Sequence, residues 1–192
     1  MAISENEYIK FIENSISWGK SFSCVILYES FENLAWYAAL RIGEIITEYF
    51  KIKEDKEINI HLSLNIVSIM THLNEMKDND VLLLISDDQN IKFITAYLSR
   101  EILVEKKNII FISKDKNPLI QPFIGITRAV MKVGTLNKGV LECLFVVSNK
   151  DEKELRITQP DTGLIQKYHN LKTTLMEETI RKQVPELEDQ NI

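Results

Sequence analysis

Apolar runs and helix-periodic segments alternate along the first 115 residues of the chain. The strand-like segments are 23–28, 58–64, 81–85 and 108–113. The segments with apolar residues at helical spacing are 34–49, 66–76 and 91–104. Segment 58–64 alternates apolar and polar residues, while 81–85 is apolar throughout, as in a strand covered on both faces. This alternation predicts an α/β fold with a central, mostly parallel sheet flanked by helices and joined by right-handed crossovers.

The pattern changes after a loop predicted over 114–122. Short apolar segments at 129–133, 140–148 and 155–158 are separated by turn-rich links, which predicts a C-terminal antiparallel meander. Asp161-Thr162-Gly163 is expected to form one more turn before a short strand at Leu164-Ile165. A last helix is predicted over 171–184, stopped by Pro185 and followed by an acidic tail.

The predicted organisation has three parts. An N-terminal helix covers 1–17, a single α/β domain covers 18–168, and a C-terminal helix with the acidic tail covers 169–192. The 192 residues are 45% hydrophobic and 27% charged, which suits one globular domain with a full core.

Charge and cysteine content narrow the classes of function. The net charge is −5 and the isoelectric point is about 5.3, so general attraction to nucleic acid is not expected, although a local basic patch remains compatible. Cys24 and Cys143 lie in apolar runs and are interpreted as buried hydrophobic residues rather than as a disulfide or metal ligands. The polar, acidic N-terminus and the lack of an apolar run of roughly 20 residues predict a cytoplasmic protein without a membrane span.

The turn after the first strand is the most informative stretch. Glu29, Ser30, Phe31, Glu32 and Asn33 join strand 23–28 to the next helix. In α/β proteins such a turn often holds phosphates, and a phosphate loop there needs the pattern G-x-x-x-x-G-K-[ST]. This turn has no glycine and no lysine but two carboxylates, and Ser30 is expected to cap the helix.

A second candidate position follows the apolar strand 81–85. Asp87 and Asp88 stand where carboxylates can coordinate Mg²⁺ beside a bound nucleotide, or where they can cap the helix that begins near Asn90. Capping is favoured because no phosphate loop is present to share the metal.

The order of elements resembles the core of RecA-like ATPases, most of all the branch of archaeal RadA paralogues and KaiC. Strand 81–85 occupies the place of the Walker B strand, and Gly163-Leu164-Ile165 the place of the closing strand after a glycine turn. The resemblance covers about three quarters of the chain, 18–165. The family's phosphate loop aligns with 29–33 and is absent, so the chain resembles a degenerate member that serves as a structural subunit. Recombinase paralogues that assist filament assembly are such members.

Electrostatics agrees with the loss of the nucleotide site. A triphosphate near Glu29 or Glu32 meets like charge, and one such pair at about 4 Å costs roughly 4 kcal/mol at a partly exposed site. The expectation is therefore no cofactor, no metal and no catalysis.

Three functions compete at this stage. The first is a non-catalytic subunit that binds protein partners in a homo- or hetero-oligomer, as an accessory to a recombinase in DNA repair. Its candidate contact residues are Trp36, Tyr37, Leu175 and Met176, although core packing is an alternative for the two aromatic residues.

The second function is nucleic-acid binding through basic residues in loops and strands, with an ordinary solvated cluster as the alternative. These residues are Lys114, Lys116, Arg128, Lys132 and Lys138. The third is a small ligand-binding enzyme on a Rossmann-like sheet. Its support is weak, because His61, His72 and His169 are scattered and no nucleophile–His–acid spacing is present.

Overall fold

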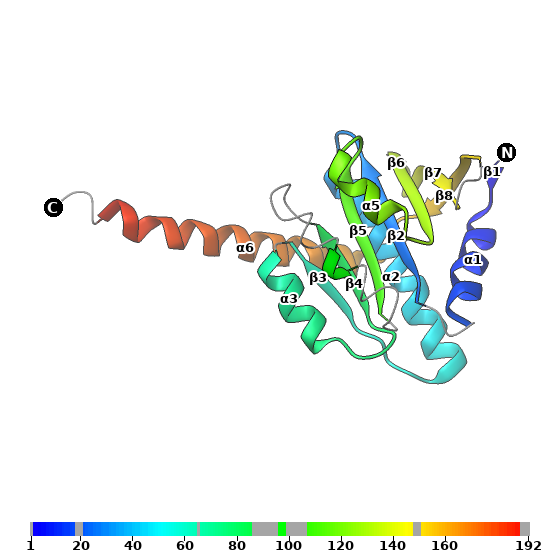
Figure 1. Cartoon of the computed structure of the whole chain (residues 1–192), viewed down its shortest axis with the longest axis horizontal. Helices are drawn as coiled ribbons and strands as arrows, with labels where there is room; N and C mark the ends of the chain where they lie inside the picture. Colours follow the sequence, from blue (N-terminus) through cyan, green and yellow to red (C-terminus); the bar gives the residue numbers. More distant parts are fainter. Residues whose placement is uncertain are drawn as a thin grey trace. The chain divides into compact units, whose positions relative to one another are not determined.

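The computed structural model describes residues 2–17, 21–64, 66–85, 96–98, 107–147 and 151–188. The chain divides into two compact units, Met1–Pro160 and Asp161–Ile192. The first unit holds the sheet and the second a long helix (Figure 1). The predictions for Asp87, Asp88 and most of the helix 91–104 concern residues outside those described.

The first unit is built on a sheet of eight described strands in the order β1-β8-β7-β6-β2-β5-β4-β3. Their bounds are β1 Ala2–Ile3, β2 Ser23–Tyr28, β3 Ile60–Ser63, β4 Val81–Ile85, β5 Asn108–Lys114, β6 Ala129–Asn137, β7 Val140–Val146 and β8 Lys153–Thr158. The strands β6, β2, β5, β4 and β3 follow one another in the sheet, and each is parallel to its neighbours in this series. β7 is antiparallel to both β6 and β8. The predicted α/β class, the mostly parallel sheet and the C-terminal antiparallel strands are confirmed.

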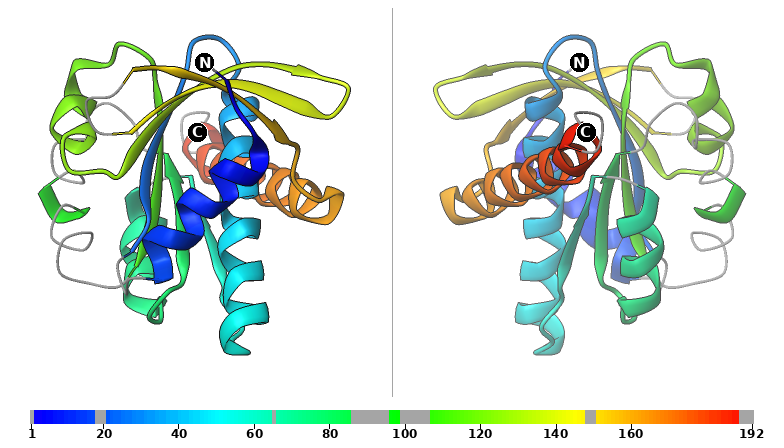
Figure 2. Two further views of the ribbon diagram at one scale, coloured as in Figure 1. Left: turned by 90° about the vertical axis from the view of Figure 1, so that its right-hand side faces the viewer. Right: turned by 90° about the vertical axis from the view of Figure 1, so that its left-hand side faces the viewer.

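Helices cover both faces of this sheet. Their bounds in the first unit are α1 Glu5–Ser17, α2 Glu32–Glu54, α3 Ile66–Glu75, the 3₁₀ turn η1 Pro118–Ile120 and α5 Gln121–Ile124. The connection β2–α2–β3 runs towards the β3 edge, whereas β3–α3–β4 runs back. Right-handed crossovers therefore place α2 and α3 on opposite faces (Figure 2).

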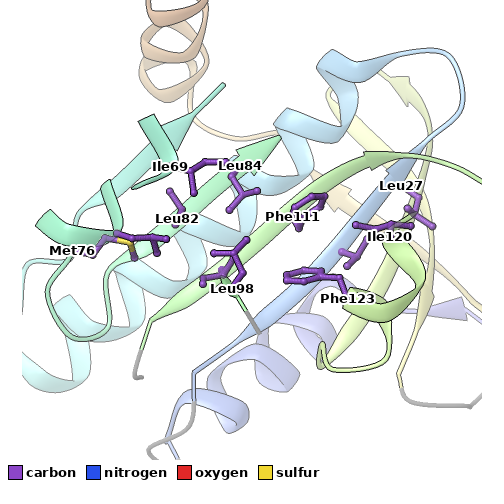
Figure 3. Close-up of a cluster of buried hydrophobic side chains, with 12 residues drawn as sticks. Leu27, Ile69, Met76, Leu82, Leu84, Leu98, Phe111, Ile120 and Phe123 are labelled. Atoms are coloured by element: carbon purple, nitrogen blue, oxygen red, sulfur yellow. The ribbon is translucent and has the colours of Figure 1, made fainter. Parts of the chain in front are cut away.

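The core on the α3 face comes from alternate strand residues. Figure 3 shows Leu82 and Leu84 of β4 and Phe111 of β5 packed among side chains of α3, η1 and α5. The Phe111 ring lies 4.9 Å from the ring of Phe123, and both side chains are fully buried. Continuous apolar strands are needed here because the intervening residues face the other layer.

On the α1 and α2 face, aromatic side chains join the first helix to the antiparallel strands. Tyr8 and Phe11 each meet the Phe145 ring edge-on, at 5.1 and 5.4 Å. Cys24 and Cys143 are buried free thiols, as predicted, and burial raises the pKa of each.

Some predicted boundaries were wrong. The helical segment predicted over 34–49 is longer in the structure, because α2 runs from Glu32 to Glu54 and ends where Asp55 adopts a left-handed conformation (φ 51°). The backbone N–H groups of Asp55 and Lys56 both donate to the Phe50 carbonyl, the second over 3.1 Å, so the left-handed residue closes the helix on this carbonyl. The predicted loop 114–122 contains η1 and the start of α5, with Pro122 in the first helical turn, where its missing N–H costs nothing.

The turn in the meander is also shorter than predicted. β6 passes through Gly134 with a register irregularity between Val133 and Thr135, and continues to Asn137. Only Lys138 and Gly139 form the turn, with φ of 48° and 78°, which is the two-residue hairpin geometry that matches the twist of the strands.

The second unit corrects the predicted closing strand. α6 spans Thr162–Glu188, so Leu164-Ile165 is helical, and the predicted boundary at 168/169 lies inside this helix. The reason is that Asp161 acts as a helix cap: its Oδ2 accepts the Gly163 N–H over 2.8 Å. α6 also continues through Pro185, where the prediction ended it. One feature of the resemblance to RecA-like ATPases, the strand after the glycine turn, is thereby removed.

In the described part of the chain, the helices are too short or too polar to span a bilayer.

Candidate functional site at the turn after β2

The turn between β2 and α2 lies at the carboxyl edge of the parallel strands. β2 ends at Tyr28, two residues bend, and α2 begins at Glu32. The Tyr28 carbonyl accepts the N–H of Asp115 over 2.7 Å, which places the residue after β5 beside this turn. The edge that holds ligands in parallel α/β sheets is therefore formed here by two adjacent connections.

The start of α2 does not resemble a phosphate cradle. Its N-cap is Phe31, which provides no side-chain hydrogen bond, so the prediction that Ser30 caps the helix was wrong. Glu32 occupies the first turn, where the helix dipole favours a carboxylate. Its Oε1 accepts the indole N–H of Trp36 over 3.2 Å.

The two aromatic residues after this turn differ in exposure. Trp36 is fully buried, so core packing, the alternative given above, accounts for it, and its role as a docking residue is withdrawn. Tyr37 is half-buried and remains a candidate contact.

A cavity of about 620 Å³ opens between this turn and the strands β6, β7 and β8. The strand side chains that line it follow from register, since Lys132, Leu144 and Glu154 are directly paired across the three strands. Their neighbours along β7 and β8, such as Phe145 and Leu155, are buried on the opposite face. We call the outward-facing side chains of β6–β8 together with 28–31 the meander face.

Carboxylates outnumber cations around this cavity. Glu29, Asp115, Glu142 and Glu154 line it together with Lys132 and Arg156, which gives a formal charge of −2.

Both lining cations already have acidic partners. Lys132 Nζ lies 3.6 Å from Glu152 Oε1, and Arg156 Nε lies 3.7 Å from Glu142 Oε1.

The remaining carboxylates have no ion-pair partner in the part of the chain that the structure describes. Within the described residues, no lysine or arginine forms an ion pair with Glu29, Asp115 or Glu154. The Asp115 carboxylate accepts the N–H of its neighbour Lys116 over 2.8 Å. The cavity is thus electrostatically suited to a cation rather than to a phosphate.

Two apolar side chains complete the cavity. Phe31 is 66% exposed and Leu144 is 37% exposed, which makes them two of the large exposed hydrophobic residues of this unit. Sequence reasoning singled out the turn but missed Asp115, Leu144 and Glu154, whose position depends on long-range strand pairing.

The five predicted nucleic-acid contacts are not brought together. Arg128 precedes β6 at the opposite edge, where its N–H donates to Ser23 and its guanidinium lies 5.7 Å from the Phe11 ring centroid. Lys138 lies at the hairpin tip, six residues beyond Lys132 and hence roughly 20 Å along the strand. Lys114, the last residue of β5, and Lys116 are close in sequence and both exposed. Lys132 reaches the same edge of the sheet on β6, on the other side of β2.

The two predicted contact residues of the second unit lie on α6. Leu175 is partly buried, and Met176 is 61% exposed.

Sequence reasoning also missed a series of hydrogen bonds between largely buried polar side chains near β3. The Asp80 carboxylate accepts the N–H groups of Asn59 and Lys77 at 3.1 and 3.0 Å and pairs with His61 Nε2 at 3.0 Å. Beside it, His72 Nδ1 bonds to Ser63 Oγ, and burial together with His61 lowers the pKa of His72.

These hydrogen bonds join the loop before β4 to β3 and to α3. Ser63 is fully buried, so its hydroxyl is closed to a substrate despite its histidine neighbour. No group of three or more potential metal-binding side chains gathers anywhere in the described ranges. The alternation in 58–64 placed His61 and Ser63 on one face, which was the available signal.

Comparisons with known proteins add little at the sequence level. No family model matches the sequence, and no curated protein matches it. The solved structures that are similar in part include a toxin domain and a pair of ATPase domains. The N-terminal domain of zonular occludens toxin from Neisseria meningitidis has 7% identity over 74% of this chain and 96% of its own, with a TM-score of 0.38.

The second structure is EssC (ATPases 2 and 3) from Geobacillus thermodenitrificans. It has 12% identity over 73% of this chain, with a TM-score of 0.38. This chain covers 37% of that structure. The fold assignment given above rests on the strand order and register of the chain itself.

Proposed function

We propose that this chain is a non-catalytic subunit that acts by binding protein partners. In this proposal a RecA-like sheet has lost its nucleotide chemistry, and the subunit assists a recombinase or another assembly of the RecA family in DNA repair. The specific assignment to RecA and RadA paralogues rests on the resemblance in element order.

The observation that carries the proposal is the chemistry of the turn after β2. Three carboxylates that have no ion-pair partner among the described residues, Glu29, Asp115 and Glu154, line the cavity where a nucleotide-binding sheet would hold a polyphosphate. The lining cations are occupied by Glu142 and Glu152. A phosphate bound there would need to displace these pairs and approach like charge, which is unfavourable by several kcal/mol.

The same cavity supports a protein-binding role. Phe31 and Leu144 expose apolar surface next to charged groups, which is the composition of a protein interface with a polar rim. The loss of nucleotide binding alone does not explain these exposed apolar side chains, whereas contact with a protein partner does.

The test is affinity purification of the full chain from its native cell, followed by identification of the co-eluting proteins. Size-exclusion chromatography with light scattering then determines the stoichiometry of the purified chain. A defined oligomer or a reproducible protein partner is expected. A monomer that captures no protein would contradict the proposal.

A further inference from the structure

We propose that the cavity on the meander face binds an arginine side chain carried by an extended segment of a partner protein, next to a leucine-like residue of that segment. This inference rests on the proposed function and specifies the chemistry of its partner.

The negative charge of the cavity favours a positively charged occupant. Glu29, Asp115 and Glu154 carry negative charge that no basic residue of the described chain balances. Lys132 and Arg156 are paired with carboxylates and add no net positive field. A positively charged occupant of the cavity is attracted by these carboxylates, whereas an anionic occupant is repelled.

The exposed aromatic ring selects arginine among cations. Phe31 is 66% exposed and lies two residues from Glu29, so a planar guanidinium can stack on the ring while its N–H groups reach a carboxylate. A lysine ammonium is a point charge that is more strongly hydrated, and it gains less from the ring.

The apolar part of the cavity favours an occupant that carries an aliphatic side chain as well as a positive charge. Leu144 is 37% exposed in the middle strand of the face, between Lys132 and Glu154. A neighbouring aliphatic side chain of the same segment covers it. Successive side chains of an extended segment point to opposite sides, so residues two apart supply the two contacts.

The probe is a fluorescein-labelled peptide in which one arginine and one leucine are separated by a single serine and flanked by serines, so that both side chains lie on the same side of the extended segment. It is titrated with the full chain and followed by anisotropy and by amide chemical shifts. Matched peptides replace arginine with lysine or with glutamate. Binding of the arginine peptide is expected below about 1 mM, weakening as salt rises from about 50 to about 300 mM. The lysine peptide is expected to bind less tightly, and the glutamate peptide not at all.

Variants of the chain locate the site. Phe31→Ala is expected to weaken binding about tenfold, and Glu29→Gln about threefold. The matched controls are Ile52→Ala, at a side chain that is 68% exposed on α2, and Glu57→Gln, at another exposed carboxylate. Both controls are expected to leave binding unchanged.

Several results would overturn the inference. These are no binding of the arginine peptide at about 1 mM, equal binding of the glutamate peptide, or equal losses in the control variants. Spermidine or Mg²⁺ alone producing the same shifts at the same concentration would show a general cation site instead. If the inference fails while a partner still co-purifies with the chain, the proposed function stands and the partner binds another surface.

Discussion

The backbone N–H of Asp115 donates to the carbonyl of Tyr28 over 2.7 Å, and this bond joins the ends of two neighbouring parallel strands. Its consequence is chemical as well as structural, because Asp115 and Glu29 both line the cavity. Two connections thus bring negative charge to the edge of the sheet where α/β proteins commonly hold anions. The turn is acidic because of two segments 86 residues apart, Glu29 and Asp115, and not because of its own sequence alone.

The core on the α3 face is expected to carry much of the stability of the first unit. Phe111→Ala removes a fully buried ring that packs 4.9 Å from Phe123, and we expect a loss of about 3–5 kcal/mol in the free energy of unfolding. Urea denaturation followed by circular dichroism measures it. Phe31→Ala, at an exposed ring, is the control and should change stability by less than about 0.5 kcal/mol.

Removal of the Tyr8 hydroxyl is expected to increase the stability of the first unit. Tyr8 is fully buried, and its hydroxyl oxygen has no hydrogen-bond partner among the described residues. Because an unsatisfied buried polar group costs about 1–3 kcal/mol, Tyr8→Phe should raise the free energy of unfolding by about 1 kcal/mol. The edge contact with Phe145 is retained in this variant. A destabilised Tyr8→Phe variant would indicate that the hydroxyl has a partner.

His72, in the hydrogen-bonded polar side chains near β3, predicts that the stability of the fold depends on pH. Burial first, and then His61, lower the pKa of His72 below its usual 6.5 in the folded state. The unfolded chain therefore binds a proton at His72 more readily than the folded chain does. The contribution of His72 to stability is complete above about pH 6.5 and declines as the pH falls through the interval down to the lowered folded value.

Equilibrium denaturation at a series of pH values tests this, with His72→Gln as the comparison. The variant should show a flatter stability profile as the pH falls below 6.5. Identical slopes in the two proteins over this range would contradict the assigned role of His72.

The chain is expected not to bind single-stranded DNA. The basic residues considered for that role lie in separate places, and Lys132 is paired with Glu152. Retention on a single-stranded DNA column at low salt measures this. Salt-dependent retention that is lost in a Lys114→Ala, Lys116→Ala double variant would contradict the expectation, because phosphate contacts weaken steeply with ionic strength.

The sequence predicted those elements whose pattern is local. The runs 81–85 and 108–113 are continuous apolar stretches, so β4 and β5 begin and end within a residue of their predicted limits. Turn chemistry was less informative: Asp161-Thr162-Gly163 has the composition of a turn, but Asp161 caps a helix instead.

The sequence predicted only the part of the site that lies in one local segment. Glu29 was visible as a carboxylate in a turn that lacks glycine and lysine. Asp115, Leu144 and Glu154 join it through a backbone bond to Tyr28 and through strand pairing, which are contacts between distant segments. No local pattern encodes such contacts.

The measurement that tests the central claim most directly is calorimetric titration of the purified full chain with Mg·ATP. Because the cavity at the β2–α2 turn presents uncompensated carboxylates, we predict no binding heat up to about 1 mM nucleotide. Saturable uptake of Mg·ATP at micromolar concentration, altered by Glu29→Gln, would contradict the account.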